Sequence, residues 1–420
     1  MSLSVSALAK LLSPTGQALL TTLPPYDESQ VLALANRLRD DGTDPELVAA
    51  TLTQSRLRTK ARTKFGEFTD QMLFTPIGVE QATRLQVAAL HARRYLAAGC
   101  THVADLTCGV GADSLALAGV GLRVTACELD EVTAAVATHN LRPFPEAQVL
   151  HQDGLTLNFA ALGIDGIYAD PARRTGGRRV FDPAAYTPPL NAVWNLREQV
   201  SAVGIKVGPG IPHQGLPPDA EVQWVSVDGD VVEAGFWFGP LAPTGPGRTA
   251  LILRNEPGGL MSRLVTSSSM PSDVQLRRSS LSRPGGDNHA PPVGPLGEYL
   301  FEPDGAVIRA GLIGVAAAEL GGSLLDPTIA YITTDALPPA SKGAPLATGY
   351  RVLDSLPFSV KRLKAYLRER NVGRVAIKKR GTAVTPEALR PQLALSGPNE
   401  ATLVLTRIAG KQSVIVVEPL

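Results

Sequence analysis

The chain has 420 residues, 44% hydrophobic and 19% charged, which suffices for two or three domains that each bury a core. Its net charge of +1 excludes nucleic-acid binding driven by a global basic field. Three cysteines without Cys-x-x-Cys pairing argue against a zinc site or a disulfide framework, so we expect no bound metal. The first residues do not have the pattern of a signal peptide and no apolar run is long enough to span a bilayer, so we expect a cytoplasmic protein.

The first 95 residues carry apolar side chains at helical spacing. Leu34, Ala35 and Leu38 fall on one helix face, and Leu85 and Ala88 repeat the pattern further along. We therefore expect a small helical domain over residues 1–95.

Residues 96–255 alternate short β-branched runs with helical stretches, which is the pattern of βαβ units around a parallel sheet. The candidate strands are His102–Leu106, Arg123–Cys127, Gln148–His151, Gly166–Asp170, Val203–Val207 and Glu221–Val227. Asp228 and Gly229 lie between two apolar runs and indicate a turn into a hairpin, although residues 230–238 also suit a short helix.

Residues 256–295 are rich in Pro, Gly and Ser and have no periodicity, which predicts a linker or long loop. Residues 296–345 form a small region in which Phe301–Leu320 is expected to be a helix and Thr328–Thr333 a strand. A domain boundary is expected near the linker.

The last unit, residues 346–420, reads as a compact α+β module. It combines the expected helix Ser359–Arg370 and strand Arg374–Ile377 with a terminal strand pair at Thr402–Arg407 and Ser413–Val417.

The segment VADLTCGVGADSLALA holds the strongest local signal, because an apolar strand ends at Asp105 and a turn with Gly109 and Gly111 leads into a helix. Glycine lets a backbone approach a ligand closely. Dinucleotide folds use the same turn, but they usually carry an apolar residue at the position of Asp105. A carboxylate there suits a ligand with an amino group.

Acidic residues also end the following strands. Glu128 stands where a carboxylate can bind two ribose hydroxyls, and Asp153 where one can accept from an adenine amino group. Asp170 ends a fourth strand. Each acid alone suits a helix cap or a solvated position. Their succession along the carboxyl edge of a parallel sheet predicts a ligand site.

Two sets of motifs carry a family resemblance. Class I S-adenosylmethionine-dependent methyltransferases have successive motifs similar to DLTCGVGAD, ACELD, HQDG and YADPARR. Bacterial members with a THUMP-like C-terminal domain resemble this chain further in FTPIGVEQATR, in FEPDGAVIRAGL, similar to a ferredoxin-like insert, and in FSVKRLKAYLRERNVGRVAIKKRG. These proteins are regarded as candidate RNA methyltransferases, distantly similar to trimethylguanosine synthases.

The resemblance implies an α/β fold: a Rossmann-like seven-stranded methyltransferase sheet with an N-terminal helical domain and a C-terminal α+β THUMP-like module. It also implies S-adenosyl-L-methionine as the cofactor. The expected cofactor-binding residues are Thr75, Gln81, Asp105, Thr107, Gly109, Gly111, Glu128, Leu129, Asp153 and Gly154. Gln81 equally suits an ordinary exposed helix position.

Asp170 and Pro171 match the start of the family's fourth motif. Amino-methylating enzymes continue this motif with a second proline and an aromatic residue, whereas this chain has Ala172 and Arg173. Because methyl transfer depends chiefly on positioning, we expect Asp170, with Pro171 and Arg173, to orient the acceptor or accept its proton. Arg173 suits stacking on a base or pairing with phosphate. A structural Asp170–Arg173 ion pair is the alternative.

Basic residues concentrate at Arg56–Lys64 and at Lys361–Arg380. The second run lies in the THUMP-like region, a type of module associated with RNA, although charge runs also suit solvated faces. The expected substrate contacts are Arg174, Arg178, Arg179, Lys361, Lys364, Lys378, Lys379 and Arg380. The sequence therefore predicts a methyltransferase acting on a tRNA or rRNA base. The alternatives are a methyltransferase of a protein or small molecule, and a non-catalytic scaffold that binds the cofactor.

Overall fold

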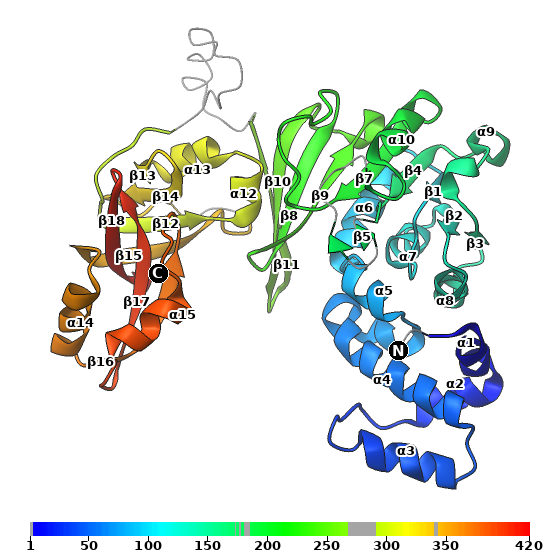
Figure 1. The fold of residues 1–420 in the computed structure, drawn as a ribbon. Helices are drawn as coiled ribbons and strands as arrows, with labels where there is room; N and C mark the ends of the chain where they lie inside the picture. Colours follow the sequence, from blue (N-terminus) through cyan, green and yellow to red (C-terminus); the bar gives the residue numbers. More distant parts are fainter. Residues whose placement is uncertain (1–2, 173, 176–177, 180–184, 268–290, 340–342) are drawn as a thin grey trace. The chain divides into compact units, whose positions relative to one another are not determined.

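A computed structural model describes residues 3–172, 174–175, 178–179, 185–267, 291–339 and 343–420 (Figure 1). The chain forms two compact units. Unit 1 comprises Met1–Val207 and Phe236–Pro243, and unit 2 comprises Gly208–Gly235 and Thr244–Leu420. In the described part of the chain, no helix combines the length and apolar character needed to cross a bilayer.

Unit 1 begins with the expected helices. They are α1 (Val5–Leu12), α2 (Pro14–Thr22), α3 (Val31–Asp40), α4 (Pro45–Phe65), α5 (Pro76–Gln81) and α6 (Leu85–Ala97). Side-chain caps satisfy the first backbone N–H groups: Asp44 Oδ1 accepts from Leu47 N over 2.9 Å, and Thr75 Oγ1 accepts from Gly78 N over 3.0 Å. Buried Phe65 and Phe74 pack in one apolar cluster with Val110, so the helices continue the core of the following sheet domain.

The sheet of unit 1 consists of parallel strands in the order β7-β4-β1-β2-β3. Their bounds are β1 (His102–Asp105), β2 (Arg123–Glu128), β3 (Ala147–His151), β4 (Gly166–Ala169) and β7 (Ala202–Val207), and the intervening helices are α7 (Ala112–Gly119), α8 (Glu131–Leu141), α9 (Phe159–Leu162) and α10 (Leu190–Trp194). The central strands are buried throughout, as their apolar runs require. The predicted α/β fold with a parallel-rich sheet is confirmed, but among the described residues the sheet that contains these strands has nine strands and not the seven predicted.

Strand order reverses at β1, because β2 and β3 follow on one side of it and β4 and β7 on the other. Open parallel sheets bind ligands at the carboxyl ends of the strands beside such a reversal. The topology therefore places Asp105, at the end of β1, at the position best suited to meet a ligand.

Unit 2 contains β8 (Glu221–Val227), β10 (Gly247–Glu256) and β11 (Gly259–Thr266), and β9 (Asp230–Trp237) runs from unit 2 into unit 1. The turn at Asp228 and Gly229 is present, and both residues have positive φ, 52° and 93°. Residues 230–237 form a strand, so the short helix considered for this segment is wrong.

The expected linker at 256–295 also needs correction. Pro257 and Gly258 form a tight turn, after which β11 pairs antiparallel with β10. Pro and Gly side by side are typical of the start of a loop, but here they fold the chain back into a hairpin. Residues 268–290 of the predicted linker lie outside the described residues.

Residues 299–334 form β12 (Tyr299–Pro303), α12 (Gly305–Arg309), α13 (Ile313–Leu320), β13 (Ser323–Asp326) and β14 (Ile329–Thr334). The helix expected over Phe301–Leu320 is thus wrong at its start. Asp304 caps α12 by accepting from Ala306 N over 2.8 Å, and Gly311, with φ of 69°, separates α12 from α13. The strand expected at Thr328–Thr333 is confirmed as β14.

The C-terminal elements are β15 (Ala347–Pro357), α14 (Val360–Glu369), β16 (Val372–Lys379), α15 (Pro386–Leu389), β17 (Asn399–Ile408) and β18 (Lys411–Pro419). They join the preceding strands in one sheet of order β13-β14-β12-β15-β18-β17-β16. The expected small region and terminal module therefore share a sheet, because β12 pairs directly with β15.

Candidate active site

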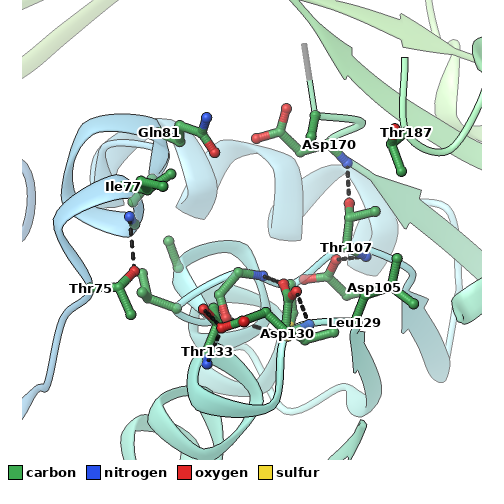
Figure 2. Close-up of a pocket in the computed structure, with 18 of the residues that line it drawn as sticks. Thr75, Ile77, Gln81, Asp105, Thr107, Leu129, Asp130, Thr133, Asp170 and Thr187 are labelled. Carbon is green, nitrogen blue, oxygen red and sulfur yellow. Dashed lines mark hydrogen bonds between the residues drawn. The ribbon is translucent and has the colours of Figure 1, made fainter. Parts of the chain in front are cut away.

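A cavity of about 890 Å³ opens at the carboxyl ends of β1 to β4, within the size range of small-molecule sites (Figure 2). All of its lining residues belong to unit 1. Asp105, Glu128, Asp153 and Asp170, one from the end of each of these strands, line it together. The row of acids predicted from the sequence thus meets in one cavity.

Asp105 is the most deeply buried of these acids, with 1% of its surface exposed. Its Oδ2 accepts from Ser114 Oγ over 2.6 Å, and its Oδ1 from Thr107 N over 3.2 Å. Burial raises the pKa of Asp105 to about 7 despite these hydrogen bonds. A cationic group placed beside this carboxylate relieves the cost of its burial.

Glu128 is fixed by two backbone N–H groups. Its Oε2 accepts from Gly109 N over 3.0 Å, and its Oε1 from Asp130 N over 2.9 Å. Gly109 has a φ of 54° and Gly111 a φ of 89°, a backbone region that favours glycine. Gly111 is also the N-cap residue of α7. The turn therefore ties the end of β2 to the start of α7 beneath the cavity.

Asp153 and Gly154 follow β3. Asp153 Oδ1 accepts from Leu155 N over 2.9 Å, which fixes the acid at the start of a short 3₁₀ turn. A Cβ on Gly154 would lie only 2.8 Å from the Cα and O of Leu106, so this position requires glycine. Gly154 thus lets the Asp153 loop pack directly on the loop after β1.

Asp170 is held through both its backbone and its side chain. Its N donates to Thr107 Oγ1 over 2.7 Å (Figure 2). Its Oδ2 accepts from Lys206 Nζ over 2.5 Å. Ala172 and Thr187 exchange two backbone hydrogen bonds, which brings Thr187 and the following prolines to the cavity wall. Arg173 lies outside the described residues.

The opposite wall comes from α5, with Thr75 at its cap and Gln81 at its end. Two lysines hold the end of this helix. Lys64 Nζ donates to the carbonyls of Glu80 and Ala82 over 2.7 and 2.8 Å, and Lys206 Nζ lies 3.5 Å from the carbonyl of Gln81. Burial, followed by the charge of Lys206, lowers the pKa of Lys64 to about 8.

Most of the predicted cofactor-binding and catalytic residues share the cavity wall. They are Thr75, Gln81, Asp105, Thr107, Gly109, Glu128, Leu129, Asp153 and Asp170. Gly111, Gly154 and Pro171 do not line it, and the two glycines act instead by shaping the backbone beneath it.

Sequence reasoning missed several residues of the wall and of the layer behind it. They are Thr83, Asp113, Thr187, Pro188 and Pro189 in the wall, and Lys206 behind Asp170. The available signal for Lys206 was a lone lysine in the apolar run of β7, since a buried charge requires partners.

The predicted substrate contacts have varied surroundings. Arg174 lies in β5 (Arg174–Thr175), and Arg178 and Arg179 form β6 (Arg178–Arg179), which pairs antiparallel with β5. In unit 2, Glu302 binds Lys378 Nζ over 3.0 Å and an Arg380 Nη over 3.2 Å. Lys379 is exposed, as are Lys361 and Lys364 on α14.

Among the described residues, no cluster of three or more His, Cys, Asp or Glu side chains is arranged to hold a metal ion. The three cysteines are buried and form no disulfide.

Comparisons with known proteins agree along most of the chain. A family model described as THUMP domain-like matches residues 347–419, and a domain of unknown function, DUF8688, matches residues 4–61. Uncharacterized S-adenosylmethionine-dependent methyltransferases from two strains of Mycobacterium tuberculosis are each 35% identical over 382 residues, 89% of this chain and 95% of theirs. The crystal structure of a candidate methyltransferase from Porphyromonas gingivalis shares the fold, with a TM-score of 0.67 at 22% identity, over 94% of this chain and 100% of that one.

Proposed function

The chain belongs to the family of S-adenosylmethionine-dependent methyltransferases of its two mycobacterial relatives, and from this premise we propose that it methylates a base of tRNA or rRNA. The observation that carries the site assignment is the row of acids from successive parallel strands in one cavity. Each acid has the chemistry that one part of the cofactor requires.

In the proposed site, Asp105 binds the ammonium group of the methionine part of the cofactor, Glu128 binds the ribose hydroxyls, and Asp153 accepts from the adenine amino group. The two Glu128 oxygens each accept one backbone N–H, so the carboxylate is held in place and keeps lone pairs for a diol. Hydrogen bonds to a charged group contribute about 1.5–3 kcal/mol each.

The backbone beneath the acids fits a nucleoside. The left-handed conformation of Gly109 makes a tight turn between β1 and α7, which leaves room for a ligand above the backbone. Because Gly154 has no side chain, the Asp153 loop can lie against Leu106. Thr75, Gln81 and Leu129 complete the walls, and Thr107 joins the cofactor side to Asp170 through its hydroxyl.

When bound, the cofactor supplies a methyl group already activated on a sulfonium, so the protein has chiefly to position the acceptor and exclude water. We assign the acceptor side to Asp170, which accepts a hydrogen bond from the group to be methylated. Its backbone N–H is held by Thr107, and the chain that follows Pro171 is fixed by the two backbone hydrogen bonds between Ala172 and Thr187. Arg173 stays a predicted base or phosphate contact.

The support for RNA comes from the C-terminal module. The THUMP-like match spans residues 347–419, and α14 within it exposes basic side chains while burying Leu363 and Leu367. Lys378 and Arg380 are engaged by Glu302, so we assign phosphate contact first to Lys361 and Lys364.

The proposal is tested by incubating the purified protein and cofactor carrying a labelled methyl group with total RNA or total protein from cells that lack the protein. We expect the label to enter RNA and to be lost on ribonuclease treatment. Mass spectrometry should also find one modified nucleoside that is present in wild-type cells and absent from cells that lack the protein. Label that enters protein alone would overturn the RNA assignment and favour the alternative of a protein substrate.

A further inference from the structure

Lys206 is a buried cation beside the proposed acceptor site that the cofactor assignment does not use. It lies near the end of β7 with 8% of its surface exposed, within a strand whose other residues are buried. Taking an ammonium group out of water costs several kcal/mol unless oxygen atoms surround it. The oxygen atoms that surround Lys206 therefore indicate what it does in the site.

The ammonium of Lys206 contacts two residues of the cavity wall from behind. Nζ is 2.5 Å from Asp170 Oδ2 and 3.5 Å from the carbonyl oxygen of Gln81. Asp170 follows β4 and Gln81 ends α5, and Figure 2 shows both side chains at the same opening, facing one another. One cation thus connects the two elements that border the proposed acceptor position.

A buried network behind Lys206 fixes its orientation. Lys206 Nζ donates to Thr83 Oγ1 over 2.9 Å, and that hydroxyl donates its own hydrogen to Asp113 Oδ2 over 2.6 Å. His91 Nδ1 lies 2.9 Å from Asp113 Oδ1. Burial opposes ionisation of Asp113, but the hydrogen bond with His91 and the charge of Lys206 hold its pKa below the ordinary value.

Because Asp113 accepts the single hydrogen of Thr83, the Thr83 oxygen is left to accept from Lys206. The direction of each hydrogen bond in the chain from Asp113 to Asp170 is thereby determined. Asp170 receives a fixed donor at Oδ2, which holds its carboxylate in one orientation.

We propose that Lys206 is a positioning residue for methyl transfer, which sets the orientation of the Asp170 carboxylate relative to Gln81 and so aligns the acceptor with the methyl donor. The inference rests on the proposed role of Asp170 at the acceptor side. Lys206 itself lies behind Asp170 and acts through it. Misplacement of a positioning group by about 1 Å can lower a rate by 10²-fold.

The test uses the full-length protein with Lys206→Met, Asp170→Asn and the double variant, assayed with labelled cofactor on whichever cellular fraction the wild type labels. We expect Lys206→Met to lower kcat by about 10²-fold with cofactor Kd changed by less than about threefold. In the Asp170→Asn background the same substitution should change kcat by less than about threefold, because the group through which it acts is already altered.

Lys206→Arg retains a cation that can donate to Asp170, so we expect it to recover at least about tenfold of the lost rate. Lys206→Gln, which keeps a donor without a charge, replaces the Met variant if loss of the buried ammonium prevents folding. Equal effects of Lys206→Met in both backgrounds, or a loss confined to cofactor affinity, would overturn the inference.

The wild-type reaction separates this inference from the RNA proposal. Label in protein alone refutes the RNA substrate, while the ratio of variant to wild-type rates still decides the role of Lys206. A wild-type protein that labels neither fraction counts against both.

Discussion

Ser114 donates its hydroxyl hydrogen to Oδ2 of Asp105 over 2.6 Å, from the first turn of α7 to the end of β1. This bond joins the two elements on either side of the glycine turn. It also stabilises a carboxylate whose burial raises its pKa to about 7. The charge of Asp105 therefore changes within the range of ordinary assay conditions.

We predict that cofactor affinity falls as the pH is lowered through 7. Protonated Asp105 cannot pair with an ammonium group, and a folded-state pKa of about 7 means that the ionised fraction falls about tenfold between pH 8 and pH 6. Calorimetric titration across this range should show the loss, and Asp105→Asn should bind weakly with a flat profile. An unchanged pH dependence in the variant would contradict the assignment of Asp105 to the ammonium group.

Glu128→Gln should weaken cofactor binding by about 10- to 100-fold, because hydrogen bonds to a charged acceptor contribute about 1.5–3 kcal/mol. Glutamine keeps one oxygen for a backbone N–H but loses the second acceptor and the charge. Glu146→Gln removes an exposed carboxylate away from the cavity and serves as the matched control. Equal affinity of both variants by calorimetry would place the ribose elsewhere.

The family resemblance and the acid row could be predicted because both depend on local sequence. Asp105 and Glu128 each end a short buried strand, so strand prediction places them at one sheet edge without any tertiary information. The match at residues 347–419 and the mycobacterial relatives confirm the family and the THUMP-like module. The roles of the individual site residues stay predictions.

The layer behind the acids could not be predicted, because it joins residues far apart in the chain. Lys206 meets Thr83 across 123 positions and Asp170 across 36, and no local pattern encodes either pairing. The helix predicted over Phe301–Leu320 failed for a different reason. Its apolar spacing is helical after Asp304, but Phe301 pairs in β12 with β14 and β15, so tertiary pairing overrides the periodicity.

Gly154→Ala should destabilise the protein and weaken cofactor binding together. Its Cβ would lie 2.8 Å from the Leu106 backbone, and forcing extra volume into a packed site costs about 1–3 kcal/mol. The displaced loop carries Asp153, so affinity should fall with stability. Gly119→Ala, where an added Cβ meets no atom within 4 Å, is the control. Denaturant unfolding and calorimetry would measure both effects, and an unperturbed Gly154→Ala would refute the close packing.

Asp170→Asn should lower turnover strongly, to a rate that is still measurable, while leaving cofactor affinity within about threefold of the wild type. The substitution removes the negative charge with which Lys206 pairs and on which the group to be methylated depends. Cofactor affinity should be spared, because Thr107 stands between Asp170 and the residues assigned to the cofactor. We expect a loss in kcat of at least about 10²-fold. Asp40→Asn, on the exposed end of α3, should retain full activity. Retained turnover in Asp170→Asn would favour a different acceptor group.

The exposed lysines of α14, Lys361 and Lys364, should contribute more to RNA affinity than Lys378 of β16, which is paired with Glu302. Leu363 and Leu367 anchor the helix in the core, so Lys361 and Lys364 point their charges away from it. Among the described residues, neither lysine has a carboxylate within ion-pair distance, whereas Lys378 is bound by Glu302. A phosphate therefore gains a full electrostatic interaction at α14 without breaking an existing pair.

Substitution of Lys361 and Lys364 by Glu should lower affinity for tRNA and make the dependence of log affinity on log salt shallower by about 1.4–1.8, since each phosphate contact contributes about 0.7–0.9 to the slope. Fluorescence anisotropy with labelled tRNA over a series of salt concentrations measures both. Lys411→Glu, at an exposed position on β18, changes the net charge by the same amount as either α14 substitution made singly and is the control for each single variant. If the control flattens the slope as much as the α14 variant does, the interaction is a diffuse charge effect and α14 is not a binding face.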